Sequence, residues 1–339
     1  MSGYGGSSVV CRLGALYVSD RDGSIRSCVG AGRHLCSRAA AVKPPPFAYA
    51  RAESAEHAVS LLTEHGDDAK LLAGGQSLIP MLNLRLARPS VLVDIGGIPG
   101  LDQMQPRGDY VDVGALMTHH AMERLAICSS PGLRALGEAA GLIGHYPIRV
   151  RGTVGGSLAH GDSASEWALM ALVMSAVLKV RGPGGTRDLP MEDFFKGLFV
   201  TALEPNEMIV SVQFKHLDAL TNLEEYARRS GDFAIAAAAT SVTLNETRCS
   251  SARVALGGVA SAPIRVIAAE RVLNGARFDT PAAMNDVVRE AAYVCSREIS
   301  PPSDCHGSQA YRQRLVTTLV DRSLRRSLRK EESLSAATH

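Results

Sequence analysis

The chain has 339 residues, of which 46% are hydrophobic and 21% charged, and its formal net charge at pH 7 is +2. This composition is typical of a soluble protein with a sizeable core, and the length suits two domains. The small net charge gives no reason to expect nucleic acid as a partner. No apolar run reaches the roughly 18 residues that a membrane span needs, so no membrane-spanning segment is predicted.

The seven cysteines are scattered, and no two of them have the C-x-x-C spacing. We therefore expect neither an iron–sulfur cluster nor a zinc site, and no metal ligands, within this chain. The odd count also argues against a closed disulfide framework. A cytoplasmic location is predicted.

Residues 1–42 show no hydrophobic period and no apolar stretch of the kind that a secretory signal needs. We interpret them as a disordered tail or a non-native extension. A globular pattern begins abruptly at Val42. Since bacterial genes can begin at a valine codon, we hypothesise that the native chain starts at Val42 and that residues 1–41 do not belong to it.

From residue 43 onward, the pattern predicts alternating helices and strands. Ser54 can cap a helix that ends at His65, and the strand Lys70–Ala73 runs directly into a glycine pair. Further strands are predicted at 91–95, 110–113 and 177–181, and helices at 118–125, 131–143 and 166–174. Gly182–Gly185 is expected to form a hairpin turn.

The pattern changes beyond about residue 222. Two long strands, Phe233–Leu244 and Ser251–Val259, precede three predicted helices at 264–273, 280–296 and 307–328. Strands followed by a run of helices indicate a compact α+β domain.

The first glycine pair lies in Ala73-Gly74-Gly75-Gln76-Ser77-Leu78. Without Cβ atoms, the glycines can direct successive main-chain N–H groups into one concavity, which can hold a phosphate oxygen. Gln76 and Ser77 add side-chain donors. The motif alone is weak evidence, because Gly-Gly after a strand is most often a turn.

Thr153-Val154-Gly155-Gly156-Ser157-Leu158 repeats this design, with hydroxyl donors on both sides of two glycines. Because a diphosphate needs donors on both of its sides, two such nests suit a dinucleotide. Neither segment has the spacing of a Rossmann G-x-G-x-x-G motif or of an NTP-binding phosphate loop. Nicotinamide binding and NTP hydrolysis are therefore less favoured.

The sequence resembles the FAD-binding medium subunit of the molybdenum hydroxylases, the family of carbon monoxide dehydrogenase and xanthine dehydrogenase. The matching blocks keep the family's order across about residues 43–328. They are Lys43–Tyr49, Leu72–Pro89, Gly152–Asp162, Phe194–Gly197, Arg228–Ala234 and Tyr311-Arg312.

The resemblance implies an α+β fold. An FAD-binding domain at 43–218 has two subdomains with the cofactor between them, and a smaller α+β domain follows at 222–330. By this resemblance, the FAD diphosphate is bound by Ala73, Gly74, Gly75, Gln76, Ser77 and Leu78. The cofactor is contacted from the other side by Thr153, Gly155, Gly156 and Ser157. Asp162 and Glu166 are candidates for the ribose or adenine end, and Leu203 for the neighbourhood of the flavin or adenine rings.

The resemblance also implies an electron-transfer role. The substrate would be oxidised on a molybdopterin-containing large subunit, and electrons would cross a [2Fe-2S] small subunit to FAD and then to an external acceptor. We expect no catalytic residue in this chain, because the flavin does the redox chemistry. A stand-alone flavin-dependent oxidase or dehydrogenase is the alternative.

Three positions depart from the family pattern: Leu198 where tyrosine is frequent, Glu225 where lysine is common, and Ser163 in place of proline. Other polar residues have simpler interpretations. We expect His119-His120 to be solvated surface, Glu224-Glu225 a solvated helix face, and Arg228-Arg229 to pair with Asp232 or contact a subunit. His160 is either near the flavin edge or an ordinary loop residue.

Overall fold

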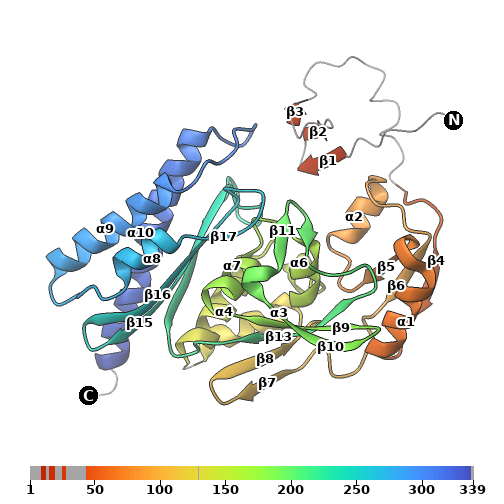
Figure 1. Cartoon of the computed structure of the whole chain (residues 1–339), viewed down its shortest axis with the longest axis horizontal. Helices are drawn as coiled ribbons and strands as arrows, with labels where there is room; N and C mark the ends of the chain where they lie inside the picture. Colours follow the sequence, from red (N-terminus) through yellow and green to blue (C-terminus); the bar gives the residue numbers. More distant parts are fainter. Residues whose placement is uncertain (1–8, 13–14, 20–24, 28–42, 129, 337–339) are drawn as a thin grey trace.

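The computed structural model describes residues 9–12, 15–19, 25–27, 43–128 and 130–336 (Figure 1). The expectations for residues 1–42 lie largely outside these residues. Within that segment three short strands form an antiparallel sheet: β1 (Val9–Arg12), β2 (Ala15–Ser19) and β3 (Ile25–Ser27).

The first subdomain is a small parallel sheet with the strand order β4-β6-β5. Its elements are β4 (Ala48–Arg51), α1 (Ala55–His65), η2 (Gly66–Asp68), β5 (Ala69–Leu72), α2 (Leu78–Asn83) and β6 (Val91–Asp94). Helix α1 begins where predicted, because the Ser54 hydroxyl accepts a hydrogen bond from the main-chain N–H of His57 at 3.1 Å. The apolar face of α1 packs against the sheet through Ala58, Val59 and Leu62.

The second subdomain is an antiparallel sheet with the order β10-β9-β13-β8-β7. The strands are β7 (Met104–Arg107), β8 (Tyr110–Gly114), β9 (Val177–Gly182), β10 (Gly185–Pro190) and β13 (Met208–Phe214). The predicted turn at Gly182–Gly185 is confirmed, since these two residues pair across the β9–β10 hairpin. A small hairpin of β11 (Phe195–Gly197) and β12 (Val200–Thr201) follows the turn η4 (Met191–Asp193).

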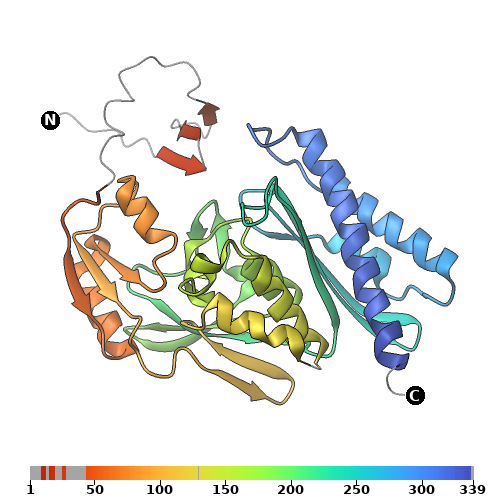
Figure 2. The same cartoon turned by 180° about the vertical axis from the view of Figure 1, so that it is seen from behind.

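Six short helical segments lie on one side of this sheet (Figures 1 and 2). They are α3 (His119–Glu123), η3 (Arg124–Ile127), α4 (Pro131–Leu142), α5 (Tyr146–Arg149), α6 (Val154–His160) and α7 (Glu166–Val173). Every residue of α7 from Trp167 to Val173 is buried. A helix that is apolar all round must be covered on all sides, and α7 lies between the second subdomain and the C-terminal sheet.

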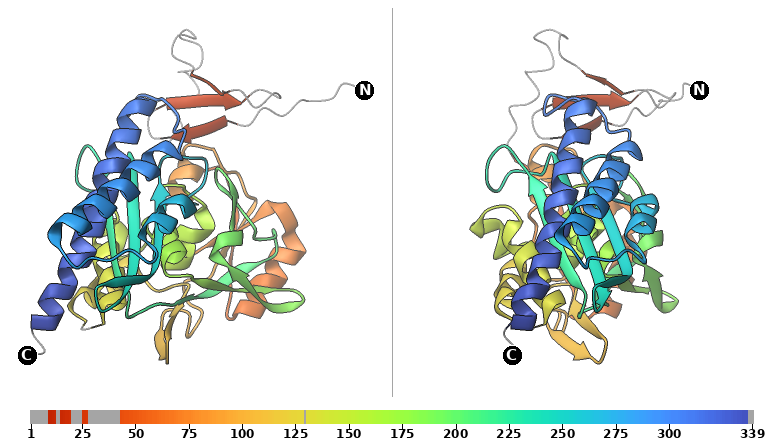
Figure 3. Two further views of the ribbon diagram at one scale, coloured as in Figure 1. Left: turned by 60° about the vertical axis from the view of Figure 1, so that its left-hand side comes forward. Right: turned by 90° about the vertical axis from the view of Figure 1, so that its left-hand side faces the viewer.

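The C-terminal domain contains an antiparallel sheet with helices packed on both of its faces (Figure 3). Its own three helices cover one face, and α4 and α7 cover the other. Its elements are β14 (Leu220–Tyr226), β15 (Ala236–Asn245), β16 (Arg248–Gly257), β17 (Ile264–Arg265), α8 (Ile267–Leu273), α9 (Pro281–Arg297) and α10 (Gln309–Ala336). Because side chains alternate along a strand, Ala236 and Ala238 face the cluster under α8 to α10, whereas Ala237 and Ala239 face α4 and α7.

The strand β14 differs from expectation. Glu224 and Glu225 were predicted on a solvated helix face, and this is wrong: both lie on β14, which pairs with β15. Thr221 and Asn222 are buried at the start of this strand, so its polar residues do not alternate with apolar ones in the way that reveals a half-buried strand. The pattern therefore concealed it.

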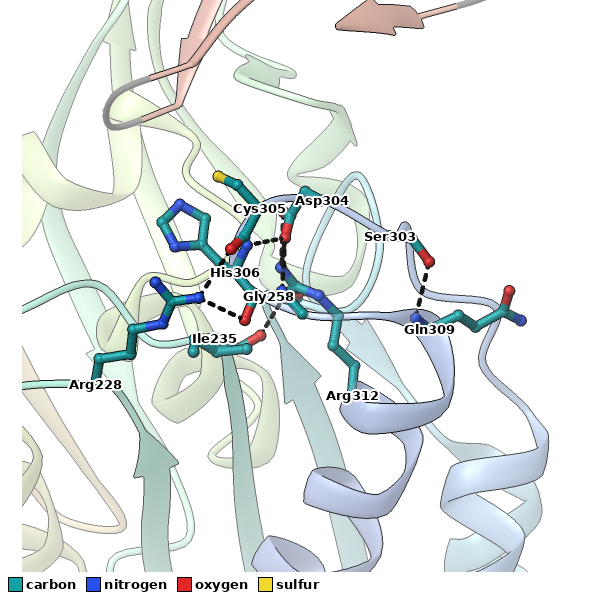
Figure 4. A network of polar contacts seen from close by, with 10 residues as sticks. Arg228, Ile235, Gly258, Ser303, Asp304, Cys305, His306, Gln309 and Arg312 are labelled. Carbon is teal, nitrogen blue, oxygen red and sulfur yellow. Dashed lines mark hydrogen bonds and ion pairs between the residues drawn. The ribbon is translucent and has the colours of Figure 1, made fainter. Parts of the chain in front are cut away.

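The loop before α10 is held by the Arg312 side chain, which is 3% exposed (Figure 4). Its guanidinium donates to the carboxylate of Asp304 at 2.7 and 2.8 Å and to the carbonyl of Gly258 at 2.7 Å. Arg228 donates to the carbonyls of Cys305 and His306 at 2.8 and 3.3 Å. These contacts join the sheet to the start of α10. Of the two expectations for Arg228-Arg229, the pair with Asp232 is therefore not formed by Arg228, and the subunit contact stays a prediction.

None of the helices in the described part of the chain has the length and apolar character needed to cross a bilayer.

Candidate cofactor-binding site

The first glycine segment leaves β5 at the carboxyl end of the parallel sheet, where ligands of such sheets commonly bind. Gly75 has φ of +73°, a conformation that favours glycine. Among the described residues, no acceptor is found for the main-chain N–H groups of Gly74, Gly75, Gln76 and Ser77. These four donors, the amide nest, are suited to an anion such as a diphosphate.

The glycine at position 74 is required by a neighbouring backbone. A Cβ atom there would lie 2.1 Å from the carbonyl oxygen of Arg151 and 2.8 Å from the Cα of Gly152. A Cβ on Gly156 would lie 3.7 Å from the Cβ of Ala73. The fold thus brings the two glycine segments, some eighty residues apart in sequence, into contact at one place.

The second segment does not form the predicted donor nest. It is the first part of helix α6, and its N–H groups are already bonded: Val154 to the Met117 carbonyl, Gly155 to the Ala115 carbonyl and Gly156 to the Thr153 hydroxyl. Thr153 therefore accepts as a helix cap instead of donating to a ligand.

The glycines of the second segment serve close packing. A Cβ on Gly155 would lie 2.6 Å from the Cβ of Ala115. The polar group that this segment can present is the Ser157 hydroxyl, which shares a hydrogen bond of 2.9 Å with the hydroxyl of Ser165. The segment forms a wall of the site beside the nest.

Asp162 and Glu166 lie in the turn from α6 to α7 and at the first residue of α7. The Asp162 carboxylate accepts from the main-chain N–H of Ala164 at 2.9 Å. Glu166 faces Glu225 of β14, and burial together with the Glu225 charge raises the pKa of Glu166 to about 8. Burial raises the pKa of Glu225 to about 7, and its Oε2 atom is buried without a hydrogen-bond partner in the described chain. Near neutral pH the pair therefore keeps a proton.

The β11–β12 hairpin approaches the other end of α6. Phe199, at its tip, has φ of +56°, which is uncommon for a bulky residue. Its ring centroid lies 5.1 Å from that of His160, and burial lowers the pKa of His160. Leu203 follows the hairpin and packs at the edge of the central core. Sequence reasoning did not single out Phe199, because no local pattern marks its conformation.

His119 is not the solvated residue that was expected. Its side chain is buried, whereas the side chain of His120 is 42% exposed. The indole N–H of Trp167 donates to Nδ1 of His119 at 3.0 Å, and burial lowers the pKa of His119 to about 4. Adjacent helical residues face different sides, so one histidine of the pair faces the core. The single tryptophan, whose buried N–H needs an acceptor, was the available signal.

Within the parts of the chain that the structure describes, no three His, Cys, Asp or Glu side chains are grouped so that they could hold a metal ion.

An amide nest at the end of a parallel sheet, walled by a second subdomain, is suited to the phosphates of a nucleotide cofactor. Residues 45–214 match the FAD binding domain in molybdopterin dehydrogenase, and residues 222–327 match the CO dehydrogenase flavoprotein C-terminal domain. The chain is 40% identical to the 6-hydroxypseudooxynicotine dehydrogenase complex subunit alpha of Paenarthrobacter nicotinovorans, over 85% of this chain and 97% of that protein.

Two carbon monoxide dehydrogenases are also similar. The medium chain from Afipia carboxidovorans is 33% identical over 84% of this chain and 97% of its own. The structure of the Hydrogenophaga pseudoflava enzyme that lacks the Mo-pyranopterin moiety superposes with a TM-score of 0.79 at 36% identity, covering 84% of this chain and 98% of that one. The chain belongs to the family of FAD-binding medium subunits of the molybdenum hydroxylases, and the predicted fold class, cofactor and family are confirmed.

Proposed function

We propose that this chain holds FAD between its two N-terminal subdomains, with the diphosphate on the amide nest, and passes electrons from iron–sulfur clusters to an external acceptor. The observation that carries the placement is the set of four successive N–H groups at Gly74 to Ser77 for which the described part of the chain supplies no acceptor. A diphosphate supplies oxygen acceptors for such donors without requiring a lysine.

The other predicted residues are assigned by their position relative to the nest. Ala73, Thr153, Gly155 and Gly156 shape the wall beside it, and Leu78 begins helix α2 behind it. Ser157, Asp162 and Glu166 lie further along α6 and its following turn, where they are proposed to face the ribose or adenine. Leu203 is proposed to lie near one of the rings.

Bound FAD supplies the redox chemistry, accepting electrons and releasing them to the final acceptor. The contribution of the chain is to bind and orient the cofactor. The amide nest offers neutral donors fixed by the backbone, so that no side chain has to reorganise when the diphosphate binds. No residue of this chain is assigned a role in substrate chemistry.

We propose a molybdopterin-containing large subunit and a [2Fe-2S] small subunit as partners. The similar proteins are named for chemically unlike compounds, carbon monoxide and 6-hydroxypseudooxynicotine, although each is matched over almost its full length. A chain that is shared across such different substrates is suited to a common task, and electron exit is common to all of these oxidations. The cytoplasm is the proposed location.

The placement of the diphosphate is tested by Ser77→Asp. A carboxylate at the end of the nest should repel the diphosphate and weaken FAD binding by about tenfold or more, measured by titration of the flavin absorbance of the purified apo-protein. The matched control is Ser54→Asp, because aspartate caps a helix as well as serine does. Unchanged FAD affinity in Ser77→Asp would show that the diphosphate lies elsewhere.

The electron-transfer role is tested by reconstitution. The isolated chain with FAD should not oxidise substrate, and its flavin should be reduced by substrate only when both partner subunits are added. Substrate turnover by the isolated chain would instead establish the stand-alone oxidase or dehydrogenase.

A further inference from the structure

His119 lies one layer beneath the contact between the two glycine segments. The residue is 4% exposed, and a Cβ added to Gly152 would lie 2.6 Å from its Nε2 atom. Gly152 is also the residue whose Cα would lie 2.8 Å from a Cβ on Gly74. The imidazole, the turn at Gly152 and the start of the amide nest are therefore stacked in this order.

The main chain fixes this turn against the segment that carries His119. The N–H of His119 donates to the carbonyl of Gly152 at 3.0 Å, and the N–H of Val154 donates to the carbonyl of Met117 at 3.0 Å. Thr118 and Thr153 form an antiparallel bridge between these two bonds. The turn thus has a backbone attachment, and the imidazole fills the space beneath it.

The orientation of the imidazole is set by Trp167. Because the indole N–H donates to Nδ1 at 3.0 Å, a neutral His119 carries its proton on Nε2, the atom beneath Gly152. Burial, with a smaller contribution from the nearby Arg149 charge, lowers the pKa of His119 to about 4. The ring therefore stays neutral in the physiological range and keeps Nδ1 available to Trp167.

We propose that His119 is a positioning residue of the FAD site: oriented by Trp167, its ring supports the turn at Gly152 and so holds the Arg151 carbonyl against Gly74, in the geometry that the amide nest requires. It acts through the turn and not by contact with the cofactor. The inference rests on the proposed function in one respect, the placement of the diphosphate on the nest.

Two variants separate the parts of this role. His119→Asn keeps an oxygen acceptor near the Nδ1 position but removes the ring beneath Gly152, whereas His119→Phe keeps a ring and loses the acceptor for Trp167. His120→Asn, at the exposed neighbour, is the control. For each protein we would measure the dissociation constants of FAD and of ADP, which shares the diphosphate half of FAD. The unfolding temperature without ligand and the emission of the single tryptophan complete the set.

Both His119 variants should remain folded and bind FAD and ADP about tenfold or more weakly than the wild type, because a displaced turn misplaces the nest. The tryptophan emission should change in His119→Phe, and His120→Asn should match the wild type in every measurement. Affinities within twofold of the wild type in both His119 variants would overturn the positioning role. So would failure of both to fold, since His119 would then be a general core residue. Failure of the wild-type chain to bind FAD would instead contradict the proposed function.

Discussion

Gly74 and Gly75 are neighbours, yet the fold requires glycine at each for a different reason. Gly75 has φ of +73°, which side chains with a Cβ rarely adopt. Gly74 has an ordinary φ, but a Cβ there would lie 2.1 Å from the carbonyl oxygen of Arg151. This obstacle is backbone, so it cannot be relieved by a change of rotamer.

Gly74→Ala should therefore separate the two glycine segments. We expect a loss of about 1–3 kcal/mol in the free energy of unfolding, as for other overpacked sites, and FAD binding weakened by about tenfold or more. Denaturant unfolding and an FAD titration measure the two effects. Gly184→Ala is the control, because a Cβ at Gly184 would meet no atom of the described residues within 4 Å, and it should be neutral in both measurements.

The Glu166–Glu225 pair predicts a dependence of stability on pH. Folding raises both pKa values, to about 8 and about 7, from the ordinary value of 4.5. Between pH 4.5 and these raised pKa values, the folded chain binds more protons than the unfolded chain. The contribution of the pair to stability is therefore complete below about pH 4.5 and is lost as the pH rises through 7 and 8. The free energy of unfolding should fall by several kcal/mol between pH 5 and pH 9, since each unit by which folding raises a pKa corresponds to about 1.4 kcal/mol.

Glu225→Gln isolates this contribution, because it removes one titrating group with little change in shape. The fall between pH 5 and pH 9 should then be clearly smaller, measured by denaturant unfolding at each pH. Glu224→Gln, one residue away on β14, is the control: its carboxylate is paired with Arg326 at 3.2 Å, and its removal should leave the slope unchanged. An identical slope in wild type and Glu225→Gln would contradict the coupled pair.

Helices and strands in which apolar residues recur at one period are predictable from the sequence. Helix α1 with its Ser54 cap and the β9–β10 hairpin were predicted close to their observed bounds. Strand β14 was missed because its buried residues include Thr221 and Asn222. The segment from Val154 was expected to be a nest of main-chain donors and is a helix, since its N–H groups find acceptors at Met117 and Ala115, which are distant in sequence.

Within the site, too, features set by one local segment are predictable from the sequence, whereas features set by contacts between distant elements are not. The first glycine segment is a local feature: its N–H groups, which have no acceptor among the described residues, follow from the conformation of Gly75 and the chain direction after β5. The partnership of His119 with Trp167 and the pairing of Glu166 with Glu225 depend on contacts between elements. Periodicity in one segment carries no information about which other segment will cover it.

The Arg312–Asp304 pair is a buried ion pair that attaches α10 to the loop before it (Figure 4). Asp304→Asn should leave the buried guanidinium without its counter-charge and cost about 3–5 kcal/mol of unfolding free energy. Asp321→Asn is the control on the same helix, because the Asp321–Arg325 pair is more exposed and should contribute at most about 1 kcal/mol. Thermal unfolding of both variants measures the two losses of stability. Similar losses would show that the buried pair stabilises the chain no more than the exposed pair does.

Across the whole molecule, the FAD-binding part and the C-terminal domain share one core. The cluster around Trp167 and Leu136 includes Leu223, Ala237 and Ala239 from the C-terminal sheet. Helices α4 and α7 are thus covered on one side by residues that lie beyond position 218. The matched family regions end and begin at 214 and 222, but the packing does not stop there.

A fragment of residues 43–218 should therefore not fold as a stable unit, because it would expose the apolar face of α4 and α7 to water. We expect it to aggregate or to bind a dye such as ANS, and to lack the near-UV circular dichroism of Trp167. A chain of residues 43–339 is the control and should fold cooperatively, since all buried residues of the described core clusters lie between Ala52 and Leu328. If the 43–218 fragment unfolds cooperatively with a native near-UV signal, the two parts have separate cores, and the C-terminal sheet is not needed to hold α7 in place.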